Sequence, residues 1–399
     1  MSATKTALII GAGIAGPIAA VALRKAGIAS TIYEAYATTA EGQGGAMMLA
    51  PNGLAALRLI GAEAAIRSIG QPIARMVLDD SQGKQLGEFG GLDGAEPSQL
   101  VWRSDLYRVL RDLAIANAIR IEYGKKLVRV AEAGHQITAY FDDGSSASGD
   151  ILIGADGIRS SVRTLIDPAA ATPQYTGLLG FGGRARVGDC AGLPGAMHFV
   201  FGTQAFLGHW REPDGGTAWF GNLPQSDPLT AAQARAVPAL DWLRKLSAIY
   251  AADMPGRMLV EKTAAEDLIV TGAGEMLNKV THWSKGRMVL VGDAVHAPSS
   301  SSGQGVSLAA ESAIELARCL RDLHDPGAAF AAYERLRRQR VEDVAANAAK
   351  TNQNKAAGPV AKALMHILMP LALKTVFTPK KMFGAYHGYR IDWNQRVTE

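Results

Sequence analysis

The stretch Thr6-Ala-Leu-Ile-Ile-Gly-Ala-Gly-Ile-Ala-Gly16 decides how this chain begins to fold. Its apolar run, residues 7–10, predicts a buried parallel strand, and residues 14–26 predict the helix that follows. A second strand is expected to end at Glu34. Three glycines in G-x-G-x-x-G spacing separate the first strand from the helix, namely Gly11, Gly13 and Gly16. This order of strand, glycine turn, helix and terminal acid is typical of a dinucleotide-binding unit.

Each part of this unit has a physical task. Gly11 permits the tight turn, Gly13 lets the backbone approach a pyrophosphate, and Gly16 lets helix and strand pack closely. The phosphates are expected at the positive helix N-terminus, beside Ile14 and Ala15. The Glu34 carboxylate can accept hydrogen bonds from a ribose hydroxyl. The motif predicts an adenosine diphosphate moiety, and by itself it leaves both NAD and FAD open.

Composition excludes several other classes of protein. The chain has 399 residues, which favours two domains, and a net charge of +4 without a long Lys/Arg run argues against nucleic acid. Cys190 and Cys319 form no C-x-x-C, so neither a metal site nor a disulfide framework is expected. The apolar stretch 361–377 contains charged residues and a proline and is too short to span a bilayer. We therefore expect a soluble, cytoplasmic protein without integral membrane contact.

Strand and helix patterns alternate along the chain in a way that predicts an α/β fold. Pieces of α/β pattern at the start, middle and end are interrupted by two β-rich stretches. We expect a discontinuous Rossmann-like domain over residues 1–71, 102–172 and 272–355. An inserted β-sheet substrate domain is expected over 72–101 and 173–271, with a C-terminal helical extension over 356–399. The most distinct single elements predicted are helices at 103–114, 240–250, 305–323 and 328–352, and strands at 197–201, 205–210 and 217–223.

Two further motifs favour FAD over NAD. In the first, Gly154-Ala-Asp156-Gly157, a carboxylate stands in a strand-to-helix turn and is followed by Arg159 and Arg163. In the second, Gly292-Asp293 ends a buried strand and leads through a serine-rich loop to glycines at a helix start. Asp293 is placed to bind a ribityl hydroxyl. Backbone N–H groups near residues 305–307 can face the electron-rich pyrimidine edge of a flavin.

With these three motifs in this order, the chain resembles the class A flavoprotein monooxygenases, the para-hydroxybenzoate hydroxylase-like family, over about residues 5 to 350. The chain is shorter than members with a large thioredoxin-like C-terminal domain, and in this it resembles the tetracycline-inactivating members of that family. The resemblance implies FAD, an arginine contact at Arg103, the backbone near Leu127 beside the adenine, and engagement of FAD and NAD(P)H by Asp156. The residues expected to bind cofactor are Gly11, Gly13, Ile14, Ala15, Gly16, Glu34, Ala35, Gly45, Arg103, Leu127, Asp156, Asp293, Gly303, Gly305, Val306 and Ser307.

The resemblance also implies the chemistry. NADPH or NADH would reduce FAD, and a flavin C4a-hydroperoxide formed with O2 would hydroxylate an aromatic or polyketide-like small molecule, such as an antibiotic or secondary metabolite. Because the chemistry is carried by the flavin, no catalytic side chain is required, although His209 and His296 are candidates. For His296 the alternative is a structural hydrogen bond. The residues expected to contact substrate are His198, His209, Trp210, Phe220 and Ser300, with ordinary packing in the sheet as the alternative.

Two positions depart from the family pattern. Ala35 stands where an arginine is usual, which removes a cation near the pyrophosphate. Ser300 stands where proline is usual, which restores an N–H donor and frees φ, so a more mobile loop is expected. Two other functions stay open: a reductase or dehydrogenase of related fold that moves hydride without inserting oxygen, and a non-catalytic flavoprotein that sequesters a ligand.

Overall fold

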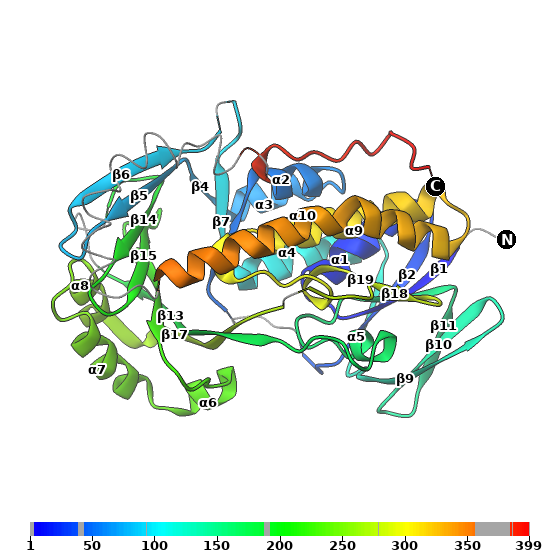
Figure 1. Ribbon diagram of the computed structural model, residues 1–399, viewed down its shortest axis with the longest axis horizontal. Helices are drawn as coiled ribbons and strands as arrows, with labels where there is room; N and C mark the ends of the chain where they lie inside the picture. The colour runs from blue at the N-terminus through cyan, green and yellow to red at the C-terminus, as the bar shows by residue number, and fades with distance from the viewer. Residues whose placement is uncertain are drawn as a thin grey trace.

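The first of two large sheets in the fold is mostly parallel and lies on the right of Figure 1. The computed structural model describes residues 4–38, 44–92, 94–186, 192–277, 279–355, 384 and 386–398. Its six strands lie in the order β18-β19-β12-β1-β2-β8, and only the β18–β19 pair is antiparallel. Their bounds are β1 Thr6–Ile10, β2 Ala29–Glu34, β8 Arg120–Tyr123, β12 Ile151–Gly154, β18 Ser284–Lys285 and β19 Met288–Leu290. The predicted strand before Asp293 is therefore shorter than its apolar run.

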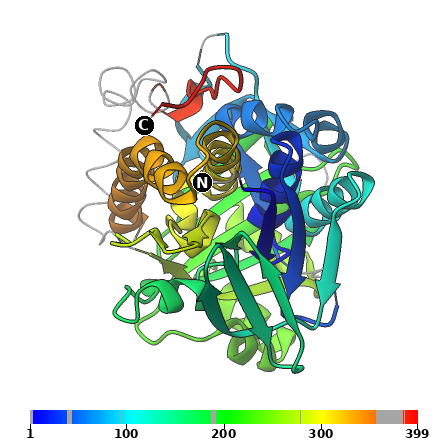
Figure 2. The same cartoon turned by 90° about the vertical axis from the view of Figure 1, so that its right-hand side faces the viewer.

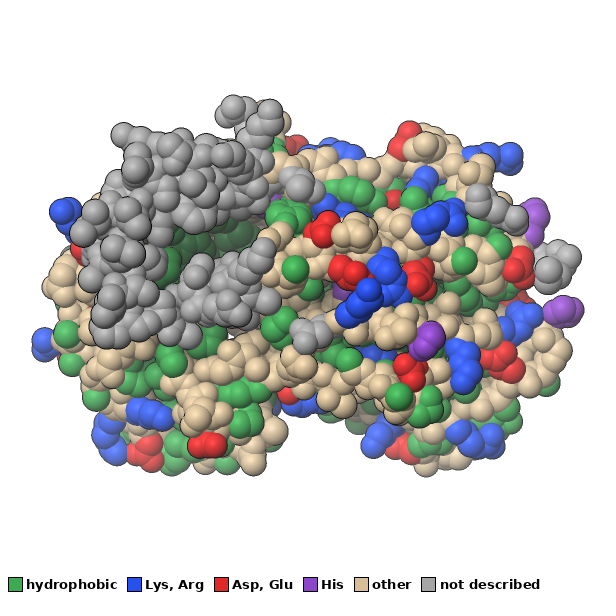
Figure 3. All heavy atoms as spheres, viewed as in Figure 1, with side chains coloured by type: hydrophobic (Ala, Val, Ile, Leu, Met, Phe, Trp, Pro, Cys, Tyr) green, Lys and Arg blue, Asp and Glu red, His purple; other side chains and the backbone are tan. Residues whose placement is uncertain are grey.

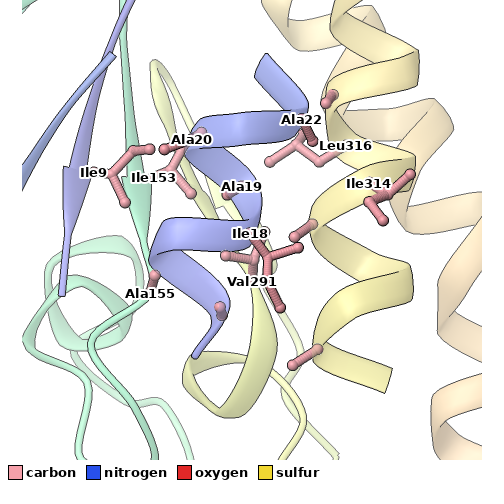
Figure 4. Packing of buried hydrophobic residues seen from close by; sticks show 14 of the residues in the cluster. Ile9, Ile18, Ala19, Ala20, Ala22, Ile153, Ala155, Val291, Ile314 and Leu316 are labelled. Atoms are coloured by element: carbon pink, nitrogen blue, oxygen red, sulfur yellow. The ribbon is translucent and has the colours of Figure 1, made fainter. Parts of the chain in front are cut away.

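Helices on both faces explain why the central strands are continuous apolar runs. The first helix, α1 (Ala15–Lys25), lies between the sheet and α9 (Gly305–Asp322), as Figure 4 shows. Its Ala20 faces Ile9 and Ile153 of the sheet, whereas Ala22 lies beside Leu316 of α9. Small side chains on α1 allow this close layering, and the helix ends in Arg24 and Lys25, which suit its negative C-terminal end. The remaining helices around this sheet are α4 Arg103–Ala116, α5 Ser161–Ile166 and α10 Pro326–Lys355.

The second large sheet lies on the left of Figure 1 and has seven strands in the order β17-β13-β16-β15-β14-β5-β6. All neighbours are antiparallel except β5 and β14, which are parallel. Its strands are β5 Arg75–Asp79, β6 Gln85–Gly90, β13 Gln174–Ala185, β14 Ala196–Phe201, β15 Phe206–Arg211, β16 Thr217–Pro224 and β17 Thr263–Met276. One of its faces is packed by the helices α6 Ala231–Ala236, α7 Ala239–Ile249 and α8 Gly256–Glu261. Two distant segments of the chain thus build one sheet, and the division into domains stays a prediction.

Two small sheets complete the described structure, and one of them lies next to the seven-stranded sheet. That sheet has the order β3-β7-β4, and the other is the meander β11-β10-β9, which Figure 2 shows beside the parallel sheet. Trp102, the last residue of β7, lies 6.0 Å from Trp210 of the seven-stranded sheet, measured between ring centroids. The bounds are β3 Ala46–Leu49, β4 Gln71–Ile73, β7 Ser98–Trp102, β9 Leu127–Ala133, β10 Gln136–Phe141, β11 Ser146–Gly149, α2 Pro51–Arg58 and α3 Glu63–Ile69.

The C-terminal extension is described only in part. Most of the predicted helical extension, residues 356–383, lies outside the described residues, as does Cys190. Residues 386–398 are described and form turns and extended chain with at most one helical turn. Arginines of α9 and α10 bind main-chain oxygens of this tail, including Arg318 at Gln395 and Arg340 at Tyr386, both at 2.9 Å. The tail therefore lies across these two helices (Figure 1).

Candidate functional site: a cofactor cleft facing an aromatic sheet

The glycine turn is shaped by three different constraints. Gly11 has φ +106°, and an added Cβ would lie 2.5 Å from the carbonyl oxygen of Ala155. A Cβ on Gly16 would lie 2.0 Å from the carbonyl oxygen of Gly11, so helix and turn touch through backbone alone. At Gly13 an added Cβ would meet only Tyr107, at 3.7 Å, which is ordinary contact. The fold therefore needs glycine at the first and third positions but not at the second.

The start of α1 is free to receive an anion. Its N-cap, Ile14, makes no side-chain hydrogen bond, and the first turn contains no acidic residue. The first backbone N–H groups of a helix, here from Ala15 onward, have no partner within the helix and carry positive dipole charge. Beside them the Glu34 carboxylate accepts the N–H of Ala12 at 2.7 Å and that of Tyr36 at 3.0 Å. A carboxylate keeps further acceptor positions, so Glu34 can both hold the turn and bind a ribose hydroxyl.

The chain after β8 runs beside this end of β2. The N–H of Lys125 donates to the carbonyl of Glu34 at 2.7 Å, two residues before the buried Leu127. Ala35 and Tyr36 are exposed, and Tyr36 has 77% of its surface free. The structure thus brings Leu127, Glu34 and Ala35 to one corner, where an adenosine is expected. Tyr36, an exposed aromatic residue at the same corner, was not predicted from the sequence.

Arg103 begins α4 beside the glycine turn. Its backbone N–H donates to the carbonyl of Gly45 at 3.1 Å, which places these two predicted residues together. Its guanidinium donates to the hydroxyl of Tyr107 at 2.8 Å and lies over that ring. Tyr107 in turn borders Gly13. Sequence reasoning missed Tyr107, although its spacing of four residues from Arg103 on a helix places the two side chains on one face.

The Asp156-Gly157 motif is joined by hydrogen bonds to the start of α5 and, through Arg163, to the second motif. Both oxygens of the Asp156 carboxylate are engaged by the start of α5, with bonds of 2.5 Å from the Ser160 hydroxyl and 2.7 Å from the Ser161 N–H. Arg163 is buried and donates to the carbonyl of Ala294 at 2.9 Å, next to Asp293. This arrangement fixes the first motif against the second. The carboxylate itself faces its own helix, and its predicted engagement of NAD(P)H stays a prediction.

Asp293 lies in the 3-10 turn η1 (Gly292–Ala294) after β19. A Cβ on Gly292, where φ is +60°, would come within 2.7 Å of the Ala15 side chain, so this turn sits directly on the start of α1. The Asp293 side chain is exposed, yet the surrounding protein removes part of its hydration and raises the pKa of its carboxyl. Arg103 acts in the opposite direction and favours the ionised form. Arg103 and Asp293 are therefore near enough to interact electrostatically.

The start of α9 gives a direct test of whether a flavin fits. Gly305 has no atom within 4 Å of an added Cβ and no positive φ, so the protein itself does not require glycine there. Gly303 has φ +60° and is the left-handed residue that ends the turn η2 (Ser300–Ser302). The first turn of α9, with Val306 and Ser307, contains no acidic residue. Open space beside free N–H groups fits the electron-rich edge of a flavin.

Ser300 and His296 lie on either side of this loop in different environments. Ser300 is exposed at the start of η2, where its carbonyl accepts the N–H of Gly303 at 3.1 Å. The greater mobility expected from serine in place of proline stays a prediction. His296 is buried, and its Nε2 lies 2.7 Å from the Ser312 hydroxyl. Burial, with the nearby Arg337, lowers the pKa of His296 to about 3, which leaves a neutral ring held as in the structural alternative.

Trp210 and Phe220 belong to an aromatic wall on one face of the seven-stranded sheet. Strand pairing places Trp210 opposite Ala218 and Phe220 opposite Gly208, all on the same face. Phe206 adds a ring 6.1 Å from Phe220. The wall packs against β3 and β7, including Trp102, the residue before Arg103. These two predicted substrate residues therefore lie on the face nearest the cofactor cleft.

His198 and His209 lie on the opposite face of that sheet. They form a cross-strand pair whose rings stack at 4.8 Å, on the side where Trp219 packs under α7 and α8. Nδ1 of His198 lies 2.7 Å from Oδ2 of Asp79, and its Nε2 accepts the backbone N–H of Leu193. The structure therefore separates the two histidines from Trp210 and Phe220. Sequence alternation alone could not show which face meets the cofactor.

Asp79, His198 and His209 are the one buried group in the described residues whose ligand atoms lie close enough for a metal, within 4.8 Å of one another. The hydrogen bonds argue against that use. If Nδ1 of His198 bound a metal, its Nε2 would carry the proton and would face the Leu193 N–H, donor against donor. The geometry is that of a neutral histidine donating to a carboxylate.

Fold and site together define an FAD-binding α/β protein, and comparison with known proteins agrees. The sequence matches the family described as "FAD binding domain" over residues 4–183 and 263–348, and the chain belongs to this family. It is 32% identical over 355 residues to the FAD-dependent urate hydroxylase of Klebsiella pneumoniae, which covers 86% of this chain and 88% of that protein. The chain is a flavoprotein monooxygenase with FAD as its cofactor, as the resemblance implied.

Solved structures confirm the fold class. The structure of a variant of Klebsiella pneumoniae HpxO complexed with FAD is similar, with a TM-score of 0.84 and 25% identity, over 96% of this chain and 99% of that one. The tetracycline destructase Tet(55) has a TM-score of 0.71 and 22% identity, over 95% and 97% of the two chains, which shows the fold alone. In the described part of the chain, no helix is both long and apolar enough to cross a membrane.

Proposed function

We propose that this chain is an NAD(P)H-consuming monooxygenase that uses O2 to hydroxylate a planar aromatic small molecule. The observation that carries this proposal is the contact between Trp102 and Trp210. Trp102 packs against the aromatic wall, and the next residue, Arg103, acts electrostatically on Asp293 in the cofactor cleft. A flat substrate lying on the wall would therefore be held beside the cofactor. The urate hydroxylase named above acts on urate, a planar heterocyclic compound, which supports this class of substrate.

The residues of the chain supply binding and exclusion of water. Bound FAD would take electrons from NAD(P)H and activate O2, so that one oxygen atom is transferred to the substrate. The half-buried ring of Phe220 offers a stacking surface, and the buried ring of Trp210 on the same face helps to keep water from the reacting face. At the rim, Glu212 accepts the indole N–H of Trp102 at 3.1 Å and pairs with Arg184. This pair can orient a polar substituent of the substrate.

The test is a panel of planar aromatic compounds, with a tetracycline included because of the fold shared with Tet(55). A substrate should accelerate NAD(P)H oxidation in air and be converted to a hydroxylated product. Reduction of the compound without O2 would instead identify a reductase. Tight binding without turnover would identify a ligand-sequestering flavoprotein. Either of these results would replace the proposed activity.

A further inference from the structure

Asn52, in the first turn of α2, joins the loop at the start of α9 to a buried charge. Only 1% of its surface is exposed. Its Nδ2 donates to Oε1 of Gln304 at 2.9 Å and to Oε1 of Glu311 at 2.7 Å. Gln304 is the N-cap residue of α9 and stands between Gly303 and Gly305. One side-chain amide therefore bridges the loop and the second turn of the helix.

Glu311 is a fixed anchor for this bridge. Arg340 donates to both of its carboxylate oxygens at 2.8 Å, and Arg337 approaches Oε2 at 2.6 Å. Burial raises the pKa of the Glu311 carboxyl, but the two arginines and Asn52 outweigh it and hold the pKa below its usual value. Arg340 is held in turn by the carbonyl of Tyr386 in the C-terminal tail. The carboxylate therefore accepts bonds on all sides and cannot turn away from Asn52.

The orientation of the Asn52 amide follows from these partners. The Glu311 carboxylate can only accept, so the NH2 group of Asn52 must face it, and the same NH2 group donates to the amide oxygen of Gln304. No carboxylate or apolar side chain can replace both bonds. A second contact fixes the same two helices, because the N–H of Ala50 donates to the Ser307 hydroxyl at 3.2 Å. An added Cβ on Gly53 would lie 2.5 Å from that hydroxyl. The start of α2 and the first turn of α9 are therefore in close contact, with no room for a side chain at Gly53.

We propose that Asn52 is a positioning residue for the flavin-facing loop, residues 303–307, and that it acts by holding the Gln304 side chain against Glu311. With that side chain tied down, the backbone N–H groups after Gln304 stay directed into the space beside Gly305, where the flavin edge is expected. This inference rests on the assignment of residues 303–307 to the flavin, and it does not depend on the substrate.

The test compares three variants of the holoenzyme, Asn52→Leu, Gln304→Leu and the double variant. FAD release on stepwise dilution is followed by flavin fluorescence, and unfolding is followed separately. Each single change should raise the dissociation constant of FAD roughly tenfold, since one hydrogen-bonded link to the loop is lost. The double variant should bind FAD no more weakly than the single variant that binds it more weakly, because both changes break the same link. Gln304→Leu also keeps the test valid if Asn52→Leu fails to fold.

Glu315→Gln is the matched control. Glu315 is buried one turn further along α9 and pairs with Arg318 and Tyr389, without contact to Asn52. This control should lower the unfolding temperature and leave FAD affinity within about twofold of the unchanged protein. The proposal is wrong if Asn52→Leu lowers stability but binds FAD normally, or if the effects of the two single changes multiply.

Gly305→Glu separates this proposal from the assignment on which it rests. Its side chain meets open space in the protein but would occupy the expected flavin position. Weakened FAD binding by Gly305→Glu with normal binding by Asn52→Leu would contradict the positioning role alone. Normal binding by Gly305→Glu would overturn the loop assignment and the positioning role together. Neither result bears on hydroxylation, which is measured by turnover.

Discussion

Replacing Gly13 by alanine should weaken FAD binding while leaving the fold intact. The added Cβ would meet only the ring and hydroxyl of Tyr107, at 3.7 Å, so the stability without cofactor should change by less than about 1 kcal/mol. The same methyl group would occupy the space through which the backbone approaches the pyrophosphate. Loss of one or two charge-assisted hydrogen bonds there costs about 1.5–3 kcal/mol of binding free energy. The dissociation constant of FAD should therefore be roughly 10- to 100-fold higher.

Gly16→Ala is the contrasting variant for this prediction. Its Cβ would lie 2.0 Å from the carbonyl oxygen of Gly11, so the backbone must move and the fold itself should lose about 3 kcal/mol or more. Thermal unfolding with and without added FAD, and FAD titration by flavin fluorescence, measure the two effects. The reasoning is refuted if Gly13→Ala binds FAD as tightly as the unchanged protein, or if it destabilises the fold as much as Gly16→Ala does.

Three further changes test other parts of the site. Phe220→Ala should raise the KM of an aromatic substrate roughly three- to tenfold through lost stacking, whereas His209→Asn, on the opposite face of the sheet, should leave that KM unchanged in steady-state assays. Arg163→Met should cost about 1–3 kcal/mol in denaturant unfolding, because the buried carbonyl oxygen of Ala294 and the part-buried one of Ile158 lose their donor. Burial lowers the pKa of His296 to about 3 and that of His387 to about 4, so between about pH 6.5 and these values the unfolded chain takes up protons that the folded chain does not. Stability should therefore fall with acidification by up to ~1.4 kcal/mol per pH unit for each histidine, and His296→Asn should remove one such contribution from the slope measured between pH 6 and 4.

The glycine turn could be predicted from sequence because its constraints are local. A left-handed φ at Gly11 and the close approach at Gly16 leave few other residues possible, and the strand and helix patterns around them set the context. The match of three separate motifs then predicted the cofactor. The fold class followed from the alternation of strand and helix patterns, and the solved structures confirm it.

The substrate face could not be predicted because it depends on register. Phe199 and His198 are neighbours in sequence, yet their side chains lie on opposite faces of the sheet, and only pairing with the next strands decides which face meets the cofactor. The bridge from Asn52 to Glu311 joins α2 to α9 across most of the chain, and no local pattern marks it. Tyr107 was missed although its helical spacing from Arg103 was visible.

The isotopic origin of the inserted oxygen tests the proposed function most directly. A compound from the aromatic panel that accelerates NAD(P)H oxidation should be turned over under 18O2, and the product examined by mass spectrometry. The proposed monooxygenase activity requires one 18O atom in each product molecule and one NAD(P)H consumed for each. A product that carries oxygen only from water, or that forms equally fast without O2, would contradict it.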